Sequence, residues 1–154
     1  MRIVQATTAD EIEHARALFT EYAAGLGFSL CFQGFDQELA DLPGDYALPV
    51  GRLLLAYDDE QLLGCIALRR RDEVTCEMKR LFLRPTARGK GAGRILVDQI
   101  LAAAREIGYQ RMVLDTVPGT MDKAIELYRS IGFREIAPYY QSPVPGALFM
   151  ELEL

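Results

Sequence analysis

Apolar residues recur along the chain with two different spacings, and each spacing predicts one kind of element. Seven short apolar runs bounded by turn-forming residues predict strands at 2–6, 53–57, 62–69, 75–83, 111–116, 133–136 and 147–152. Apolar residues at helical spacing predict four helices, over about 8–25, 36–42, 91–107 and 121–131. Thr8 and Glu11 form a capping box that opens the first helix, and Gly108 is the expected C-terminal cap of the third.

The connections between these elements predict one α/β domain over residues 1–154. Short polar turns at 58–61 and 70–73 join three consecutive strands, so these strands are expected to pair antiparallel. No internal repeat, low-complexity segment or linker interrupts the pattern. A length of 154 residues suits a single domain with one core.

Composition narrows the classes of function and the expected location. The net charge of -5 argues against a nucleic-acid partner, because binding to phosphate backbones needs clustered cations. No apolar run approaches the ~20 residues needed to span a bilayer, and the first residues lack the pattern of a signal peptide. Cys31, Cys65 and Cys76 are expected to be reduced and buried. Together these observations predict a cytoplasmic protein with no membrane association.

The most informative stretch is Arg88-Gly89-Lys90-Gly91-Ala92-Gly93, which lies between a predicted strand and a predicted helix. The first N–H groups of a helix have no partner within it, and the helix dipole favours negative charge there. Because glycines have no side chain, a ligand can approach the backbone closely. The pattern is therefore typical of a phosphate site. A glycine-rich turn that binds nothing is the alternative.

Two common phosphate-binding motifs do not fit this loop. A Walker loop would need Gly at position 84 and Ser or Thr at position 91, where the chain has Arg84 and Gly91. A dinucleotide fingerprint aligned on Gly91 and Gly93 would need a small residue in place of Leu96. The pattern that fits is Arg-x-x-Gly-x-Gly. At this point the chain resembles the GNAT superfamily of acyl-CoA-dependent N-acyltransferases.

A second motif supports the resemblance. Leu127-Tyr128-Arg129-Ser130-Ile131-Gly132-Phe133 is similar to the Leu-Tyr-x-x-x-Gly-Phe signature of the family, and it follows the loop in the family's order. The predicted order of strands and helices also resembles the GNAT fold over essentially the whole chain. The resemblance implies a mixed, mostly antiparallel sheet flanked by helices, in which two neighbouring strands splay into a V.

The resemblance implies acetyl-CoA as the cofactor and suggests which residues bind it. In the family this loop wraps the coenzyme A pyrophosphate, which implies contacts from Arg88, Gly89, Lys90, Gly91, Ala92, Gly93 and Arg94. Leu81 and Leu83 match the strand whose backbone pairs with the pantetheine arm, a form of strand addition. Thr116 stands near the position where many relatives carry an Asn that touches this arm. Asp115, beside it, is a candidate contact for the ammonium group of the acceptor.

The resemblance also implies how the acyl group is transferred. Tyr128 matches the tyrosine that reaches the coenzyme sulfur, so it is the expected general acid; a packed core aromatic is the alternative. Glu77 lies eleven residues before Arg88, similar to a catalytic glutamate of the histone acetyltransferase branch, and is the expected base. A water chain as base, with Glu77 only a wet strand residue, is the alternative. Because His14 is the only histidine, neither a histidine-rich metal site nor a Ser-His-Asp triad is expected.

We therefore predict an N-acetyltransferase that transfers an acetyl group from acetyl-CoA to a primary amine of a small molecule or peptide. A non-catalytic acyl-CoA-binding or regulatory module is the alternative. The acceptor cannot be read from the sequence, although segment 28–46 and Tyr139-Tyr140 are expected to line its pocket. The basic run Arg69-Arg70-Arg71 is either a solvated turn or a group that attracts an anionic acceptor such as an amino acid. Formation of a homodimer is left open.

Overall fold

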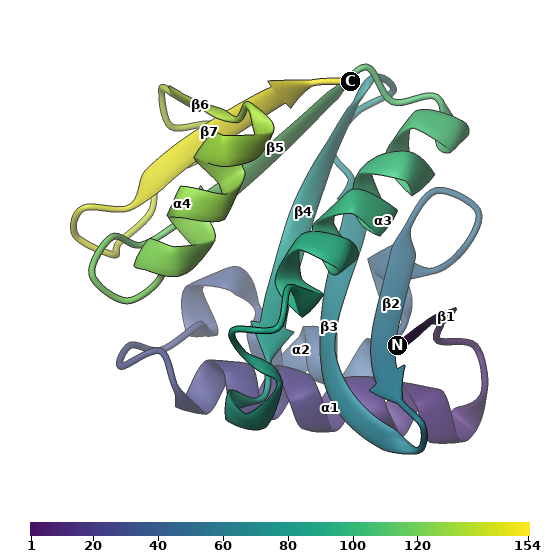
Figure 1. The fold of residues 1–154 in the computed structure, drawn as a ribbon. Helices are drawn as coiled ribbons and strands as arrows, with labels where there is room; N and C mark the ends of the chain where they lie inside the picture. The colour runs from purple at the N-terminus through teal and green to yellow at the C-terminus, as the bar shows by residue number, and fades with distance from the viewer.

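The computed structural model describes all 154 residues as a seven-stranded sheet with helices on both faces (Figure 1). The strands are β1 (Arg2–Gln5), β2 (Arg52–Asp58), β3 (Gln61–Arg70), β4 (Thr75–Leu83), β5 (Arg111–Thr116), β6 (Arg134–Ile136) and β7 (Leu148–Glu153). The helices are α1 (Ala9–Ala24), α2 (Phe35–Asp41), α3 (Ala92–Ile107) and α4 (Asp122–Ile131). Each strand and helix expected from the sequence is present, and the predicted α/β class is confirmed. Three short 3-10 helices, η1 (Cys31–Gln33), η2 (Gly44–Tyr46) and η3 (Pro85–Ala87), were not expected.

The sheet is mostly antiparallel, as predicted. Its strand order is β1-β2-β3-β4-β5-β7-β6. Every neighbouring pair is antiparallel except β4 and β5, which run parallel. The short turns after β2 and β3 produce the antiparallel pairs, whereas α3 is the crossover connection that a parallel pair requires.

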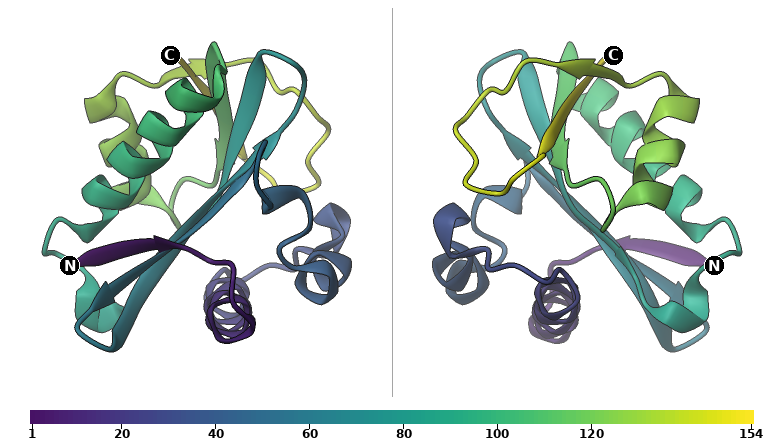
Figure 2. Two further views of the ribbon diagram at one scale, coloured as in Figure 1. Left: turned by 90° about the vertical axis from the view of Figure 1, so that its right-hand side faces the viewer. Right: turned by 90° about the vertical axis from the view of Figure 1, so that its left-hand side faces the viewer.

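Two cores form because successive residues of a strand point to opposite faces of the sheet. Leu54 and Ala56 of β2 pack in the core that α3 covers, together with Ile100. Leu53 and Leu55 pack in the core on the other face, with side chains from α1. Figure 2 shows α1 and α2 on one side of the sheet and α3 and α4 on the other. Since both faces are covered, β2 is apolar at nearly every position instead of alternating.

The parallel pair β4 and β5 forms the predicted V. The two strands pair only between Thr75–Glu77 and Arg111–Val113, and they separate toward the lower part of Figure 1. Beyond this short ladder β4 pairs with β3 alone. Arg80 lies at a bulge in β4, where the register with β3 shifts and φ is 62°. The strand edge that faces β5 is therefore left without a partner.

The helix ends follow the signals in the sequence. The Glu11 N–H donates to Thr8 Oγ1 at 3.2 Å and the Thr8 N–H donates to Glu11 Oε1 at 3.1 Å, which is the capping box expected for α1. Gly108 ends α3 with φ of 110°, a conformation that favours glycine. None of the helices is both long and apolar enough to cross a membrane.

The cysteines are all free, but they differ in exposure. Cys65 in β3 and Cys76 in β4 are buried, as predicted. Cys31 is exposed, so its expected burial is wrong. It begins the short helix η1, which has no buried residue.

Candidate active site

A cleft of about 580 Å³ lies where β4 and β5 separate. Its walls come from α1, the segment 25–33, β4 with the loop that follows it, β5, α4 and the segment 142–147. Of the thirteen candidate catalytic, cofactor-contact and ammonium-contact residues, the structure brings eight to this cleft: Leu81, Leu83, Arg88, Gly89, Gly93, Asp115, Thr116 and Tyr128. The other five are not among its lining residues: Glu77, Lys90, Gly91, Ala92 and Arg94.

The loop before α3 brings the N-terminus of that helix to the cleft. Gly89 and Gly91 have φ of 77° and 80°, a region that residues with a side chain rarely adopt. No side chain caps α3, and the N–H groups of residues 89–94 donate to no acceptor within the chain. Six adjacent donors without partners are suited to a bound anion such as a phosphate.

The cationic side chains around this loop differ in whether they already have a hydrogen-bond or ion-pair partner within the chain. Arg88 Nε donates to the carbonyl oxygen of Leu83 at 3.0 Å. Arg94 Nε lies 3.1 Å from Asp98 Oδ1 on the exposed surface of α3. Lys90 is exposed and forms no ion pair within the chain. Of the three, Lys90 has the side chain most available to a ligand.

The free edge of β4 forms a second wall of the cleft. Residues 78–83 line it, and their backbone has no partner strand on the side of β5. An extended ligand that carries amide groups can pair with such an edge as an added strand. Thr116, on the facing strand, is 2% exposed, and its hydroxyl donates to Met121 Sδ at 3.3 Å.

Tyr128 reaches the cleft from α4 and is fixed there by packing. Its ring lies 5.6 Å from the ring of Phe133, and the residue is 6% exposed. The hydroxyl forms no hydrogen bond within the chain. It is not sealed inside the protein, because Tyr46 Oη is the one fully enclosed side-chain polar atom that lacks a partner. Burial raises the pKa of Tyr128 above its ordinary value of 10.0, and Tyr22 and Asp115 add to the shift. The hydroxyl therefore keeps its proton at neutral pH.

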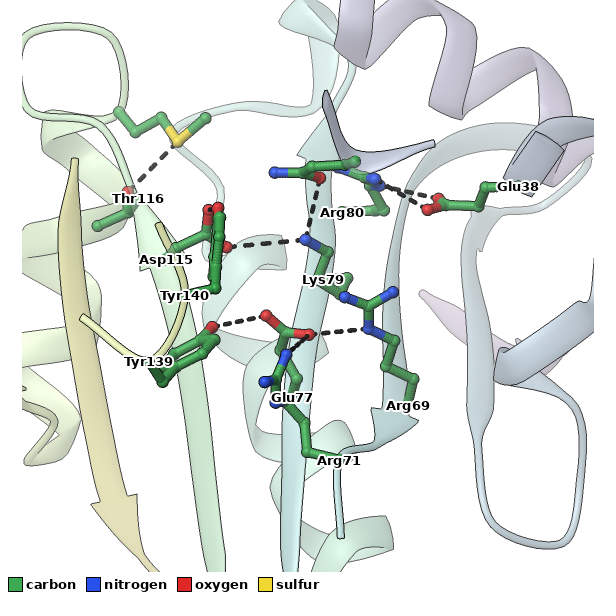
Figure 3. Close-up of polar contacts among 12 residues, drawn as sticks. Glu38, Arg69, Arg71, Glu77, Lys79, Arg80, Asp115, Thr116, Tyr139 and Tyr140 are labelled. Carbon is green, nitrogen blue, oxygen red and sulfur yellow. Dashed lines mark hydrogen bonds and ion pairs between the residues drawn. The ribbon is translucent and has the colours of Figure 1, made fainter. Parts of the chain in front are cut away.

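Glu77 is fully buried at the centre of a polar cluster (Figure 3). Its Oε1 lies 2.8 Å from Arg69 Nε and 3.8 Å from Arg71 Nη1. Its Oε2 accepts a hydrogen bond from the Tyr139 hydroxyl at 2.6 Å. The alternative of a wet strand residue is wrong, because these side chains exclude solvent from the carboxylate. Arg69 and Arg71 are accordingly counter-ions of Glu77 and not merely a solvated turn.

Lys79 of β4 and Asp115 of β5 form a second polar group, and both residues line the cleft (Figure 3). Lys79 Nζ lies 3.7 Å from Asp115 Oδ1 and donates to Gln33 Oε1 at 3.0 Å. Asp115 Oδ2 accepts a hydrogen bond from the Tyr140 hydroxyl at 2.5 Å. A cation and an anion, both largely buried, thus stand together in the cleft.

The segment between β6 and β7 connects the two arms of the V. Tyr139 bonds to Glu77 on β4, and its neighbour Tyr140 bonds to Asp115 on β5. The two rings pack against Phe149 at centroid distances of 5.1 and 5.2 Å, which holds the segment to β7.

The model of the acetyltransferase (GNAT) family matches residues 13–133 of this chain. The chain belongs to the GNAT family. An uncharacterized N-acetyltransferase of Schizosaccharomyces pombe is 39% identical over 94% of this chain and 89% of its own length. Another, from Dictyostelium discoideum, is 31% identical over 100% of this chain and 99% of its own. The solved structure of an acetyltransferase from Salmonella typhimurium with its cofactor acetyl-CoA has the same fold, with a TM-score of 0.73 and 20% identity over 99% of this chain and 92% of that one.

Membership of the GNAT family confirms the resemblance inferred from the loop and from the Leu127 to Phe133 motif. The aromatic segment after α1 contributes both to the cleft and to the core. Phe28 and Phe32 line the cleft of this GNAT chain, whereas Phe35 is part of the core on the α1 side.

Sequence reasoning missed Lys79, a buried charged residue of this GNAT cleft. A signal for it was present. Residues two apart in a strand share a face, so Lys79 lies on the same face of β4 as Glu77, whereas Met78 packs in the core on the other side. Two charged residues on one face of a strand indicate a polar site against that face.

Proposed function

We propose that this protein transfers the acetyl group of acetyl-CoA to the primary amine of a small molecule or peptide. The observation that carries the proposal is the row of N–H donors at residues 89–94, which have no acceptor in the chain and belong to a loop that lines the cleft. A pyrophosphate supplies the negative charge and the acceptor atoms that this helix N-terminus lacks. The acetyl-CoA of the similar Salmonella typhimurium structure supports the choice of cofactor.

The rest of the cleft fits the remainder of this cofactor. The free edge of β4 at Leu81 and Leu83 is suited to the amide groups of the pantetheine arm, with Thr116 on the facing strand. Arg88, which lines the cleft, and Lys90, which forms no ion pair, are the proposed phosphate contacts among the side chains, since Arg94 is already paired with Asp98. When bound, acetyl-CoA supplies an acetyl group activated as a thioester.

Tyr128 is the proposed general acid. Its Oη holds a proton at neutral pH and has no partner within the chain, so the proton is available to a leaving sulfur atom in the cleft. Loss of that proton leaves a buried phenolate, which is unfavourable. The proton that the amine loses on acylation must therefore be returned to Tyr128 Oη.

Glu77 is the proposed base, and its contacts limit how it can act. The carboxylate touches Arg69, Arg71 and Tyr139 and does not line the cleft, so a proton reaches it only through an intervening group. The pH profile of turnover in Glu77→Gln tests the role. If Glu77 is the base, the variant is expected to lose the most turnover at low pH and to recover part of it as the pH rises. A uniform loss, matched by Tyr139→Phe, would show that Glu77 positions the cleft instead.

A non-catalytic acyl-CoA-binding module is the competing function, and one experiment separates the two. Thiol release from acetyl-CoA is measured against a panel of primary amines, with Tyr128→Phe as the matched control. We expect release above background with at least one amine, and much less with the variant. Acetyl-CoA binding by calorimetry without release from any amine would favour the module.

Residues 1–154 are proposed to act as a single catalytic domain in the cytoplasm. The continuous sheet supports a single domain. The three free cysteines fit a reducing compartment.

A further inference from the structure

Lys79 is a buried cation whose hydrogen bonding is incomplete. Its side chain is 4% exposed and belongs to the cleft wall. An ammonium group carries three N–H donors, yet Gln33 Oε1, at 3.0 Å, is the one acceptor within hydrogen-bonding distance. Asp115 Oδ1, at 3.7 Å, attracts the charge but is too far to accept a bond. The remaining donors need acceptors that the chain does not supply, because a buried charge is unfavourable without them.

The guanidinium groups on either side of Lys79 are already paired. Arg80 donates from Nε and Nη2 to the two oxygens of Glu38, each at 2.9 Å. Arg69 Nε donates to Glu77 Oε1 at 2.8 Å. Of these three cations, Lys79 is the one without a carboxylate within hydrogen-bonding distance. It is also one that lines the cleft, so a ligand can reach it.

The pKa of Lys79 agrees with this geometry. Burial lowers it below its ordinary value of 10.5, and the neighbouring carboxylates Asp115 and Glu77 offset only part of the shift. A lowered lysine pKa means that the folded protein favours the ammonium form less than water does. An anion beside Nζ would reverse this effect.

Asp115 supplies the complementary charge in the same cleft. Its side chain is 14% exposed, and only Oδ2 accepts a hydrogen bond, from Tyr140. Oδ1 has no donor within hydrogen-bonding distance and is free to accept one from a ligand. An ammonium group in the cleft can therefore bind at Oδ1.

We propose that the acceptor is an amino acid or a similar small molecule, with a carboxylate within a few bonds of its primary amine. Lys79 binds the carboxylate, and Asp115 binds the amine before it loses its proton. With its carboxylate beside Lys79 and its ammonium beside Asp115, such a molecule places each of its charges next to the opposite charge of the cleft. This inference rests on the acetyl transfer proposed above and names the class of acceptor.

The charges of the cleft favour a carboxylate over a phosphate as the acceptor's anion. A phosphate carries up to two negative charges and is bound preferentially by arginine forks or helix N-termini. Among the buried cations beside Asp115 and Glu77 one lysine is available, because Arg80 and Arg69 are engaged with Glu38 and Glu77. A single ammonium group matches the single charge of a carboxylate.

Matched substrate pairs test the proposal. The kcat/KM for thiol release is measured for several α-amino acids and for the amide of each, which keeps the amine and the side chain but removes the negative charge. The amide's amine has the lower pKa, so intrinsic reactivity favours the amide. We nevertheless expect each reactive acid to exceed its amide by about tenfold to a hundredfold, the range of one charge-assisted hydrogen bond.

Two variants locate the cause of this preference. In Lys79→Met the acid is expected to lose its advantage over its amide through a raised KM, so that the ratio of their kcat/KM values falls to about one or below, while a circular dichroism spectrum like that of the wild type reports an intact fold. In Asp115→Asn the kcat/KM of the acid and that of its amide are both expected to fall, with their ratio preserved, because both molecules carry the amine.

Each other result overturns the inference. If the kcat/KM of the amides equals or exceeds that of the acids in the wild type, the inference is refuted whatever the variants do. A preference for the acid that persists in Lys79→Met also refutes it. Thiol release from amines without a carboxylate, and from no amino acid, also refutes it but leaves the proposed acetyl transfer standing. Absence of release from every amine removes both.

Discussion

Arg80 and Glu38 form a two-bond ion pair, in which Nε and Nη2 each lie 2.9 Å from a different carboxylate oxygen. The side chains are 2% and 12% exposed, so the pair is largely shielded from water. It joins the bulge of β4, where Arg80 has φ of 62°, to helix α2. The bulge of β4 is therefore anchored by Glu38, a residue far away in the sequence.

Glu38→Gln is expected to lower the free energy of unfolding by about 3 kcal/mol, because removing one partner leaves a buried, uncompensated guanidinium. Urea denaturation followed by circular dichroism measures the change. Asp98→Asn is the control, since it breaks the exposed pair of Arg94 and Asp98 and is expected to cost less than ~1 kcal/mol. Equal costs for the two variants would mean that the buried pair does not anchor the bulge.

Gly91→Ala is expected to weaken acetyl-CoA binding by about tenfold or more, or about 1.4 kcal/mol. The residue has φ of 80° and precedes the free N–H groups of α3, so a side chain strains the loop that a phosphate must approach. Gly108→Ala is the matched control, because Gly108 caps the other end of the same helix with φ of 110°. Calorimetry that finds the same affinity in both variants would show that the loop does not hold the cofactor.

Tyr128→Phe is expected to lower turnover by roughly 10²–10⁴, the usual effect of losing a general acid, with acetyl-CoA affinity nearly unchanged. Tyr109→Phe is the control: it removes a buried hydroxyl that donates to the carbonyl oxygen of Val50 at 2.6 Å, outside the cleft. That variant should lose about 1 kcal/mol of stability and keep its turnover. Full activity in Tyr128→Phe would remove the general-acid role.

Lys79→Met is expected to be more stable than the wild type at pH 7. The folded pKa of Lys79 lies below 10.5, because burial disfavours the ammonium in the folded state relative to the unfolded chain. Between the folded pKa and 10.5 the unfolded chain binds more protons, so wild-type stability rises with pH and the difference between the two proteins shrinks. Urea denaturation at several pH values measures this.

The control for that experiment is Lys123→Met, at an exposed position, which should change stability by no more than about 0.5 kcal/mol at any of these pH values. A Lys79→Met protein that is less stable than the wild type at pH 7 would show that the buried ammonium is not disfavoured.

Local patterns in the sequence were enough to predict the elements. The helix predicted over about 91–107 is α3 (Ala92–Ile107), and the strand predicted at 75–83 is β4 (Thr75–Leu83). These predictions succeed because apolar spacing, caps and turns act over a few residues. The phosphate-type loop was recognised for the same reason.

The polar interior of the site could not be read in this way. Alternation in β4 left a solvent-exposed Glu77 as an alternative, yet Tyr139 covers it from 62 residues further along the chain. Lys79 likewise depends on Gln33, which is 46 residues away. The positive φ of Arg80 has no signal of its own, because bulges are set by pairing with the neighbouring strand and not by one residue type.

Adjacent tyrosines hold one carboxylate on each arm of the V, and this has an evolutionary consequence. Tyr139 and Tyr140 belong to the segment between β6 and β7, whereas the six free N–H donors belong to the loop before α3. Inherited changes in one segment need not alter the other. A lineage can thus acquire a new acceptor by substitutions around these tyrosines while it keeps an unchanged site for the common acyl donor.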